Sequence, residues 1–177
     1  MKIPVDDLEE IRHRLAITEA EQLTAAEHEV NILFDTASGR LATSGQVLRV
    51  RRVGQRILLT FKGPANYDGA VKQRREIELE ISSSERISEL LHALGYAPTM
   101  RYEKKRESWR LGEVRIELDH TPMGNFVELE GPADSLAATA QGLGLDPAAA
   151  VAQSYISLWR DHCRRHPGLD RDMVFDS

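Results

Sequence analysis

The fold of this chain is decided by a stretch in which charged and apolar side chains alternate, Lys72-Gln73-Arg74-Arg75-Glu76-Ile77-Glu78-Leu79-Glu80-Ile81. Successive side chains of a β-strand point to opposite faces. One face therefore carries Lys72, Arg74, Glu76, Glu78 and Glu80, and the other carries Ile77, Leu79 and Ile81. One strand does not tell whether its ionic face meets water or a ligand, because a half-buried antiparallel sheet shows the same alternation. The pattern of the other strands is needed to distinguish a solvent-exposed ionic face from a ligand-binding one.

Several other segments also have the pattern of strands. Residues 27–34 are extended, residues 47–52 and 56–62 predict a hairpin around Gly54, and residues 63–69 have the composition of a loop. Three more strands are expected at residues 101–111, 113–119 and 125–130. The cations that share a phase against an apolar set are Arg49, Arg51, Lys62, Lys72, Arg74, Lys104 and Arg106. The carboxylates that do so are Glu76, Glu78, Glu80, Glu117, Asp119, Glu128 and Glu130.

These charges are sorted by sign along the strands. Like charges two apart on one strand repel unless a counter-charge lies across the sheet or an ion binds between them. If the sheet curls with this face on its concave side, a basic wall faces an acidic wall. Such a cavity suits a polyphosphate with a divalent metal, because Arg and Lys grip phosphate oxygens and carboxylates hold hard cations. The alternative is an open sheet whose charged face meets solvent.

Helices are expected on both sides of the strand region. Asp6 followed by Glu9 predicts a first helix, which leaves residues 1–5, too few for a complete strand. Ser83 or Ser84 can cap a second helix, which we expect to pack on the apolar face of the sheet.

The C-terminal third is predicted to be helical. Asp134 can cap one helix, and Asp146-Pro147 supplies the first residues of another, with Tyr155 and Trp159 on its apolar stripe. From Pro167 onward the chain is mostly polar, and we expect it to be loosely held. No linker divides the chain into two domains.

The overall composition excludes several classes of protein. The 177 residues are 41% hydrophobic and 29% charged, which is enough for one substantial core. A net charge of -5 argues against a nucleic-acid or membrane-surface binder. No apolar run is long enough to cross a membrane, and no signal peptide precedes the first helix. The single Cys163 fits a reducing compartment, so we expect a cytoplasmic protein.

An ordered set of motifs follows the strands: Arg49-Val50-Arg51, Thr60-Phe61-Lys62-Gly63-Pro64, Lys72-Gln73-Arg74-Arg75-Glu76-Ile77-Glu78, Glu103-Lys104-Lys105-Arg106, Leu118-Asp119 and Gly124-Asn125-Phe126-Val127-Glu128-Leu129-Glu130-Gly131. Phe34-Asp35-Thr36 and Ser154-Tyr155 complete it. Together these motifs resemble the CYTH superfamily, the triphosphate tunnel metalloenzymes, which include class IV adenylate cyclases and thiamine triphosphatases. The resemblance covers about residues 2–160 and is greatest to the class IV cyclase branch.

The resemblance implies an α+β fold, an antiparallel β-barrel or tunnel with helices packed outside. It implies one CYTH-like domain over residues 1–163, a tail over residues 164–177, and a homodimer. The residues implied to bind a triphosphate are Arg49, Arg51, Lys62, Lys72, Arg74, Lys104 and Arg106. Those implied to serve Mg2+ or Mn2+ are Glu76, Glu78, Asp119, Glu128 and Glu130, and those implied to be catalytic are Lys2 and Arg106.

One motif of the family departs from the pattern in this chain. The family's first strand carries Glu-x-Glu-x-Lys, and Lys2 aligns with the lysine, so both glutamates would precede Met1. We expect either a start site set too late, which an upstream Glu-x-Glu codon pair would reveal, or the loss of part of the metal site. In the second case, substrate binding would survive while catalysis weakens.

Three functions remain open within this resemblance. A class IV adenylate cyclase converts ATP to cyclic AMP and pyrophosphate, and this is the function that we favour. A triphosphatase instead hydrolyses inorganic or thiamine triphosphate. A catalytically impaired protein would bind a nucleotide or polyphosphate without turnover. Metal clamping of the phosphates serves the first two alike, so spacing does not separate them.

Overall fold

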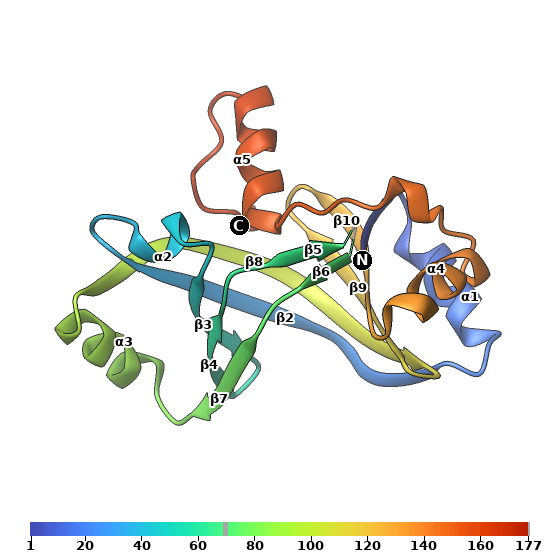
Figure 1. Ribbon diagram of the computed structural model, residues 1–177, viewed down its shortest axis with the longest axis horizontal. Coiled ribbons are helices and arrows are strands. Elements are labelled where there is room, and N and C mark those ends of the chain that lie inside the picture. The colour runs from blue at the N-terminus through green and yellow to red at the C-terminus, as the bar shows by residue number, and fades with distance from the viewer. Residues whose placement is uncertain (69–70, 177) are drawn as a thin grey trace.

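The computed structural model describes residues 1–68 and 71–176 and contains an eight-stranded antiparallel sheet surrounded by helices (Figure 1). The strand order is β1-β10-β9-β8-β2-β3-β4-β7. The strands are β1 (Lys2–Val5), β2 (Glu21–Thr36), β3 (Val47–Val53), β4 (Arg56–Lys62), β7 (Glu76–Ile81), β8 (Tyr96–Leu111), β9 (Val114–Thr121) and β10 (Gly124–Glu130). The α+β expectation is confirmed. However, the sheet is not closed into a barrel, because β1 and β7 form its two edges.

The long strands β2 and β8 form the spine of the sheet, and their pairing sets which side chains share a face. Glu29 of β2 lies opposite Lys104 of β8, and Asn31 of β2 lies opposite both Tyr102 of β8 and Arg51 of β3. Residues paired across a sheet point to the same side. The alternating charges therefore gather on one face, which we call the inner face.

Helices cover the opposite, apolar face. Helices α1 (Leu8–Ala16) and α4 (Ala133–Gly142) bury it over β1, β9 and β10, where Leu15, Ile116, Leu129 and Leu136 are among the core residues. Helix α3 (Ser84–Ala93) covers the other half, through Leu91. The expectation that this second helix packs on the apolar face is confirmed.

Helix α5 (Tyr155–Arg165) instead lies over one end of the inner face. Its Tyr155 and Trp159 pack with Leu33 and Met100, which share the phase of the charged residues. The short helix α2 (Arg40–Thr43) follows β2 at the same end (Figure 1). Within the described ranges, no helix combines the length and apolar composition needed to cross a membrane.

Several local expectations were wrong. The quoted stretch is not one strand, because it divides at Arg74 and Arg75 into β6 (Val71–Gln73) and β7. Strand β6 pairs with β5 (Asn66–Asp68), which lies within the expected loop of residues 63–69. The Arg75 carbonyl accepts a hydrogen bond from the Gly63 N–H (2.8 Å). The expectation for residues 1–5 was not wrong: β1 has only four residues, as expected of a segment too short for a complete strand, and it pairs with β10.

The last predicted helix also begins later than expected. Asp146 caps only a 3-10 turn, η1 (Pro147–Ala149), and the chain is then extended until Ser154 caps α5. The Ser154 hydroxyl accepts a hydrogen bond from the Ser157 N–H (3.2 Å), which fixes the start of α5.

The C-terminal tail is held against the sheet, so the expectation of a loosely held tail was wrong. Strand β9 pairs with β8 only from Lys105 onward, which leaves the preceding edge of β8 free. Met173 fills this edge: its N–H donates to the Arg101 carbonyl (3.0 Å), and its carbonyl accepts from Glu103 (2.8 Å). The Met173 side chain is 0% exposed, beneath α5. An unpaired strand edge is a ready site for an added strand.

We predict that Met173→Ala lowers the free energy of unfolding by about 2 to 5 kcal/mol, because it opens a cavity in the core beneath α5. Urea unfolding followed by circular dichroism measures the loss. Leu169→Ala is the matched control, since Leu169 is 45% exposed in the same tail and should change stability by less than about 0.5 kcal/mol. Equal, small effects of the two substitutions would show that the tail does not pack as described.

Candidate functional site

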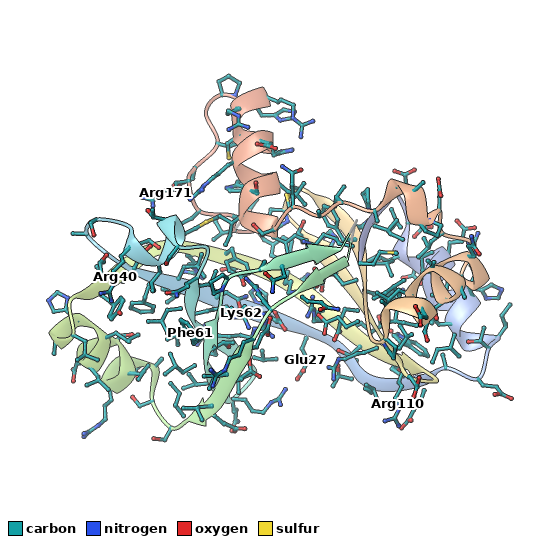
Figure 2. The ribbon with its side chains drawn as sticks, viewed as in Figure 1. Glu27, Arg40, Phe61, Lys62, Arg110 and Arg171 are labelled. Carbon is teal, nitrogen blue, oxygen red and sulfur yellow. The ribbon has the colours of Figure 1, made fainter. Side chains whose placement is uncertain are left out.

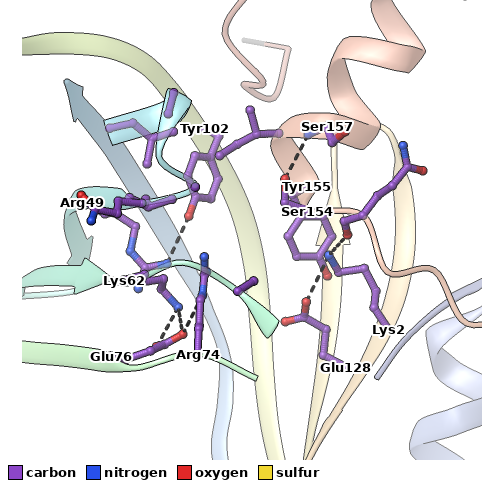
Figure 3. Close-up of a pocket in the computed structure, with 18 of the residues that line it drawn as sticks. Lys2, Arg49, Lys62, Arg74, Glu76, Tyr102, Glu128, Ser154, Tyr155 and Ser157 are labelled. Carbon is purple, nitrogen blue, oxygen red and sulfur yellow. Dashed lines mark hydrogen bonds and ion pairs between the residues drawn. The ribbon is translucent and has the colours of Figure 1, made fainter. Parts of the chain in front are cut away.

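A cavity of about 850 Å³ lies on the inner face, between the sheet and α5 (Figure 3). Its cationic lining includes Arg160 of α5 and Arg171 of the tail, and on the sheet side Lys2, Arg49, Arg51, Lys62, Arg74, Lys104 and Arg106. Its acidic lining consists of Asp35, Glu76, Glu128 and Glu130. The structure thus gathers most of the residues that the sequence singled out. The charged face therefore lines a cavity and does not only face open solvent.

One wall of the cavity is built by β4 and by the residues before and within β7. The register places Lys62 opposite Glu76, and the Lys62 ammonium donates to that carboxylate at 2.7 Å. Arg74 Nε also donates to Glu76, at 3.3 Å. Burial tends to raise the pKa of Glu76, but these two cations lower it overall. Figure 2 shows Lys62 among the strands near the middle of the molecule.

The floor of the cavity rests on a buried ion network centred on Asp119, which is 0% exposed. Its carboxylate accepts from Lys104 Nζ (3.0 Å), Arg106 Nε (2.7 Å) and the Tyr155 hydroxyl (2.6 Å). Burial would raise the pKa of Asp119, but the positive charges of Arg106 and Lys104 hold it well below its ordinary value. Arg106 also bonds to Glu128, so the network reaches the opposite wall.

The opposite wall is formed by β1, β10 and the start of α5. Pairing of β1 with β10 places Lys2 opposite Glu128, and their charged groups lie 3.4 Å apart. The Lys2 ammonium also donates to the Gln153 carbonyl (3.0 Å) and lies 3.8 Å above the Tyr155 ring. Burial lowers the pKa of Lys2. Figure 3 shows Lys2 and Glu128 facing Lys62 and Glu76 across the cavity.

Strand β2 supplies inner-face residues that the sequence argument missed. Glu29 is buried, with its Oε1 3.1 Å from Arg51 Nη1. Asn31 is also buried, and its Oδ1 accepts from Arg51 Nε at 3.0 Å. Both residues share one phase against Val30 and Ile32. The alternation rule applied to the other strands would therefore have found them.

Asp35 fixes the end of the cavity that lies next to α2. Its carboxylate accepts hydrogen bonds from the backbone N–H groups of Thr36 (2.7 Å), Leu41 (2.9 Å) and Ala42 (2.9 Å). These bonds hold α2 against the end of β2, where Leu41 and Ala42 line the cavity. Burial tends to raise the pKa of Asp35, but these N–H groups lower it overall.

Some expected site residues lie elsewhere. Glu78 does not line the cavity: it accepts from the Thr60 hydroxyl (2.8 Å) and is 3.7 Å from Arg49. Asp119 supports the floor from beneath without lining the cavity. The side chain of Lys72 lies outside the described residues, so its expected role is not examined by the structure.

The fit of a divalent cation can be tested on the carboxylates. Among the described residues, no three His, Cys, Asp or Glu side chains are grouped as a metal site. Glu128 and Glu130 occupy alternate positions of β10 and line the cavity together, with Glu76 across from them. Mg2+ is commonly held by one or two carboxylates together with substrate phosphates. The lining thus fits an ion that binds with phosphates, but not a closed site made by protein alone.

Several solved structures have a similar fold. An X-ray structure from Vibrio parahaemolyticus, titled a "putative adenylate cyclase", aligns with a TM-score of 0.79 and 22% identity, covering 90% of this chain and 95% of that one. The PH1819 protein of Pyrococcus horikoshii aligns with a TM-score of 0.75 and 26% identity, covering 91% and 97%. A Hippeastrum protein has a TM-score of 0.69 and 17% identity over 92% and 94%, and its title reports a dominant triphosphatase activity.

Sequence comparisons agree with the structural ones. A Methanocaldococcus jannaschii protein named "putative adenylate cyclase" is 25% identical over 131 residues, which cover 73% of this chain and 74% of that protein. The model of the CYTH domain matches residues 1–144, most of the chain. The chain therefore belongs to the CYTH family.

Proposed function

We propose that this protein is a metal-dependent adenylate cyclase that converts ATP to cyclic AMP and pyrophosphate within the inner-face cavity. The observation that carries the proposal is the cavity lining, in which cations from both walls and the floor surround a space large enough for a nucleotide. The relatives named as adenylate cyclases support the choice of ATP.

The basic residues would bind the triphosphate. Arg49, Arg51, Lys62 and Arg74 would hold phosphate oxygens from the β3, β4 and β7 side, and Lys104 and Arg106 from the floor. Phosphate oxygens would compete with Glu76 for Lys62 and Arg74. Glu76 would then be released from its present ion pairs and gain free acceptor oxygens. We assign the same binding role to Lys72.

The acidic residues would serve the cation. Glu76, Glu128 and Glu130 are the assigned carboxylates that line the cavity, and Glu78 and Asp119 would support the same side through their ion pairs with Arg49 and Arg106. A bound Mg2+ or Mn2+ would neutralise phosphate charge and polarise the phosphorus–oxygen bonds. In this role Asp119 orients Lys104 and Arg106 from below.

The cyclase reaction requires the ribose 3′-oxygen to attack the α-phosphorus. The new oxygen–phosphorus bond forms as the bond to pyrophosphate breaks, and the hydroxyl proton passes to a base or solvent. We assign Arg106 and Lys2, which meet at Glu128, to stabilise the negative charge that develops on the phosphates.

A triphosphatase is the second candidate, because the Hippeastrum structure of the same fold carries a title that reports this activity. In that reaction, water attacks the terminal phosphorus and orthophosphate leaves. The cations of the cavity would serve this reaction equally, so the products must separate the two.

We expect the purified protein, incubated with ATP and Mg2+ or Mn2+, to form cyclic AMP and pyrophosphate in equal amounts, as measured by chromatography. Chelation of the metal should abolish turnover. Lys62→Met should lower kcat/KM at least about 100-fold, because it removes a preorganised cation from the phosphates.

Arg86→Ala is the matched control, since Arg86 is exposed on α3, away from the cavity. If orthophosphate forms without cyclic AMP, the protein is a triphosphatase and not a cyclase. Binding of ATP without turnover would show a nucleotide-binding protein. Absence of both binding and turnover would overturn the proposal.

We predict that Asp119→Asn reduces stability at neutral pH by about 3 to 5 kcal/mol, because it breaks a buried ion pair. The pKa of Asp119 is lower in the folded protein than its ordinary value of about 4. Its contribution is therefore present above that pH and lost as the pH falls below it. Urea unfolding between pH 7 and pH 3 should give a shallower decline for Asp119→Asn than for the wild type. Asp134→Asn, at an exposed position, should follow the wild-type curve; parallel curves for all three proteins would contradict the prediction.

A further inference from the structure

The cavity has a densely charged part and an end near α2 and α5 that is richer in apolar side chains, which we call the apolar end. Strand pairing brings Leu33 opposite Met100 on one side and opposite Arg49 on the other, so the two parts meet at this row of the sheet. Beyond it, the lining includes the apolar Leu41 of α2 and Ile156 of α5, together with the charged Arg160 of α5 and Arg171 of the tail. The lining therefore suits a ligand that carries both an anionic group and a less polar group.

Tyr102 lies at the boundary between these parts. Its ring packs with Leu33, Met100 and Met173, and its hydroxyl points toward Arg49 (Figure 3). The side chain lines the cavity although it is only 7% exposed. The residue thus turns its ring toward the apolar end and its hydroxyl toward the charged part.

The Tyr102 hydroxyl can donate a hydrogen bond to a ligand. Arg49 Nη1 donates to its oxygen at 3.2 Å, and this oxygen acts as an acceptor in that bond. Among the side chains that the structure describes, which exclude those of residues 67–72, no hydrogen bond uses the hydroxyl as a donor. A phenol can donate one hydrogen bond while it accepts another. Because Tyr102 lines the cavity, an oxygen of a bound ligand can accept this hydrogen bond in place of water.

The surrounding charges strengthen this donor. Burial tends to raise the pKa of Tyr102, but the positive charges of Arg49, Arg51 and Lys104 lower it overall. A more acidic hydroxyl donates a stronger hydrogen bond. The position of the hydroxyl and its undonated proton support the inference without this change in acidity, which only strengthens the hydrogen bond.

We propose that Tyr102 is a specificity-determining residue that donates a hydrogen bond to an oxygen of the organic group joined to the triphosphate. In ATP that oxygen belongs to the ribose. The cations of the charged part would bind the triphosphate. The Tyr102 hydroxyl lies where that part meets the apolar end, so it would reach the organic group instead. This inference rests on the proposed function, because it assumes that a nucleoside triphosphate occupies the cavity.

The test compares two ligands on one variant. Calorimetry in the presence of Mg2+ measures the affinity for an ATP analogue in which methylene groups replace both bridging oxygens, and for a tripolyphosphate with the same two replacements; neither the cyclase nor the triphosphatase reaction can cleave these bridges. We expect Tyr102→Phe to weaken binding of the ATP analogue about 5- to 10-fold, which is the loss of one hydrogen bond. Binding of the tripolyphosphate analogue should change less than twofold.

Tyr96→Phe is the matched control, since Tyr96 is on the same strand and its hydroxyl accepts from Arg40 outside the cavity. It should bind both analogues like the wild type. Because the readout is a ratio of two affinities, a small loss of stability in Tyr102→Phe does not imitate the expected result.

Two results would overturn the assignment of Tyr102 while leaving the proposed function intact. The first is an equal loss of affinity for both analogues in Tyr102→Phe, and the second is no loss of affinity for either. Both results assume a wild type that binds both analogues. A wild type that binds neither analogue would overturn the proposed function together with this inference.

Discussion

The structure depends on the pairing of charges that the sheet turns inward. Asp119 is the centre of this pairing, because it is buried and holds Lys104 and Arg106 together. An isolated charge in such a place would cost several kcal/mol, and a charge with partners costs much less. Each cation of the floor therefore has an acid beside it. The cavity can carry many charges and still belong to a stable fold.

The pairing in turn requires that the apolar faces of the strands be covered from outside. Helices α1, α3 and α4 supply this cover, with Leu15, Leu91 and Leu136 at the contacts. Helix α5 and the tail cover one end of the inner face, and they keep Tyr155 against Asp119. The sheet encloses a cavity without closing into a barrel, since α5 provides part of the enclosure that a further strand pairing would give.

The sequence predicted which side chains share a face of the sheet, because side chains alternate between the two faces along a strand. Alternation placed Arg49, Lys62 and Glu128 on one face, and the structure brings them to one cavity. It did not predict contacts that depend on the fold as a whole. The free edge of β8, which Met173 fills, exists only because β9 ends early, and nothing near Met173 in the sequence indicates it. Tyr102 was overlooked because a tyrosine in a strand has no charge to mark its face.

The central claim is that the paired charges of the inner face exchange partners with a metal-bound triphosphate. A crystal structure of the protein with Mn2+ and α,β-methylene ATP tests this most directly, because Mn2+ is located by its anomalous scattering. The account predicts phosphates in contact with Arg49, Lys62 and Arg106, and Mn2+ within bonding distance of Glu76 or Glu128. A nucleotide bound on the outer surface, or Mn2+ bound away from these carboxylates, would contradict it.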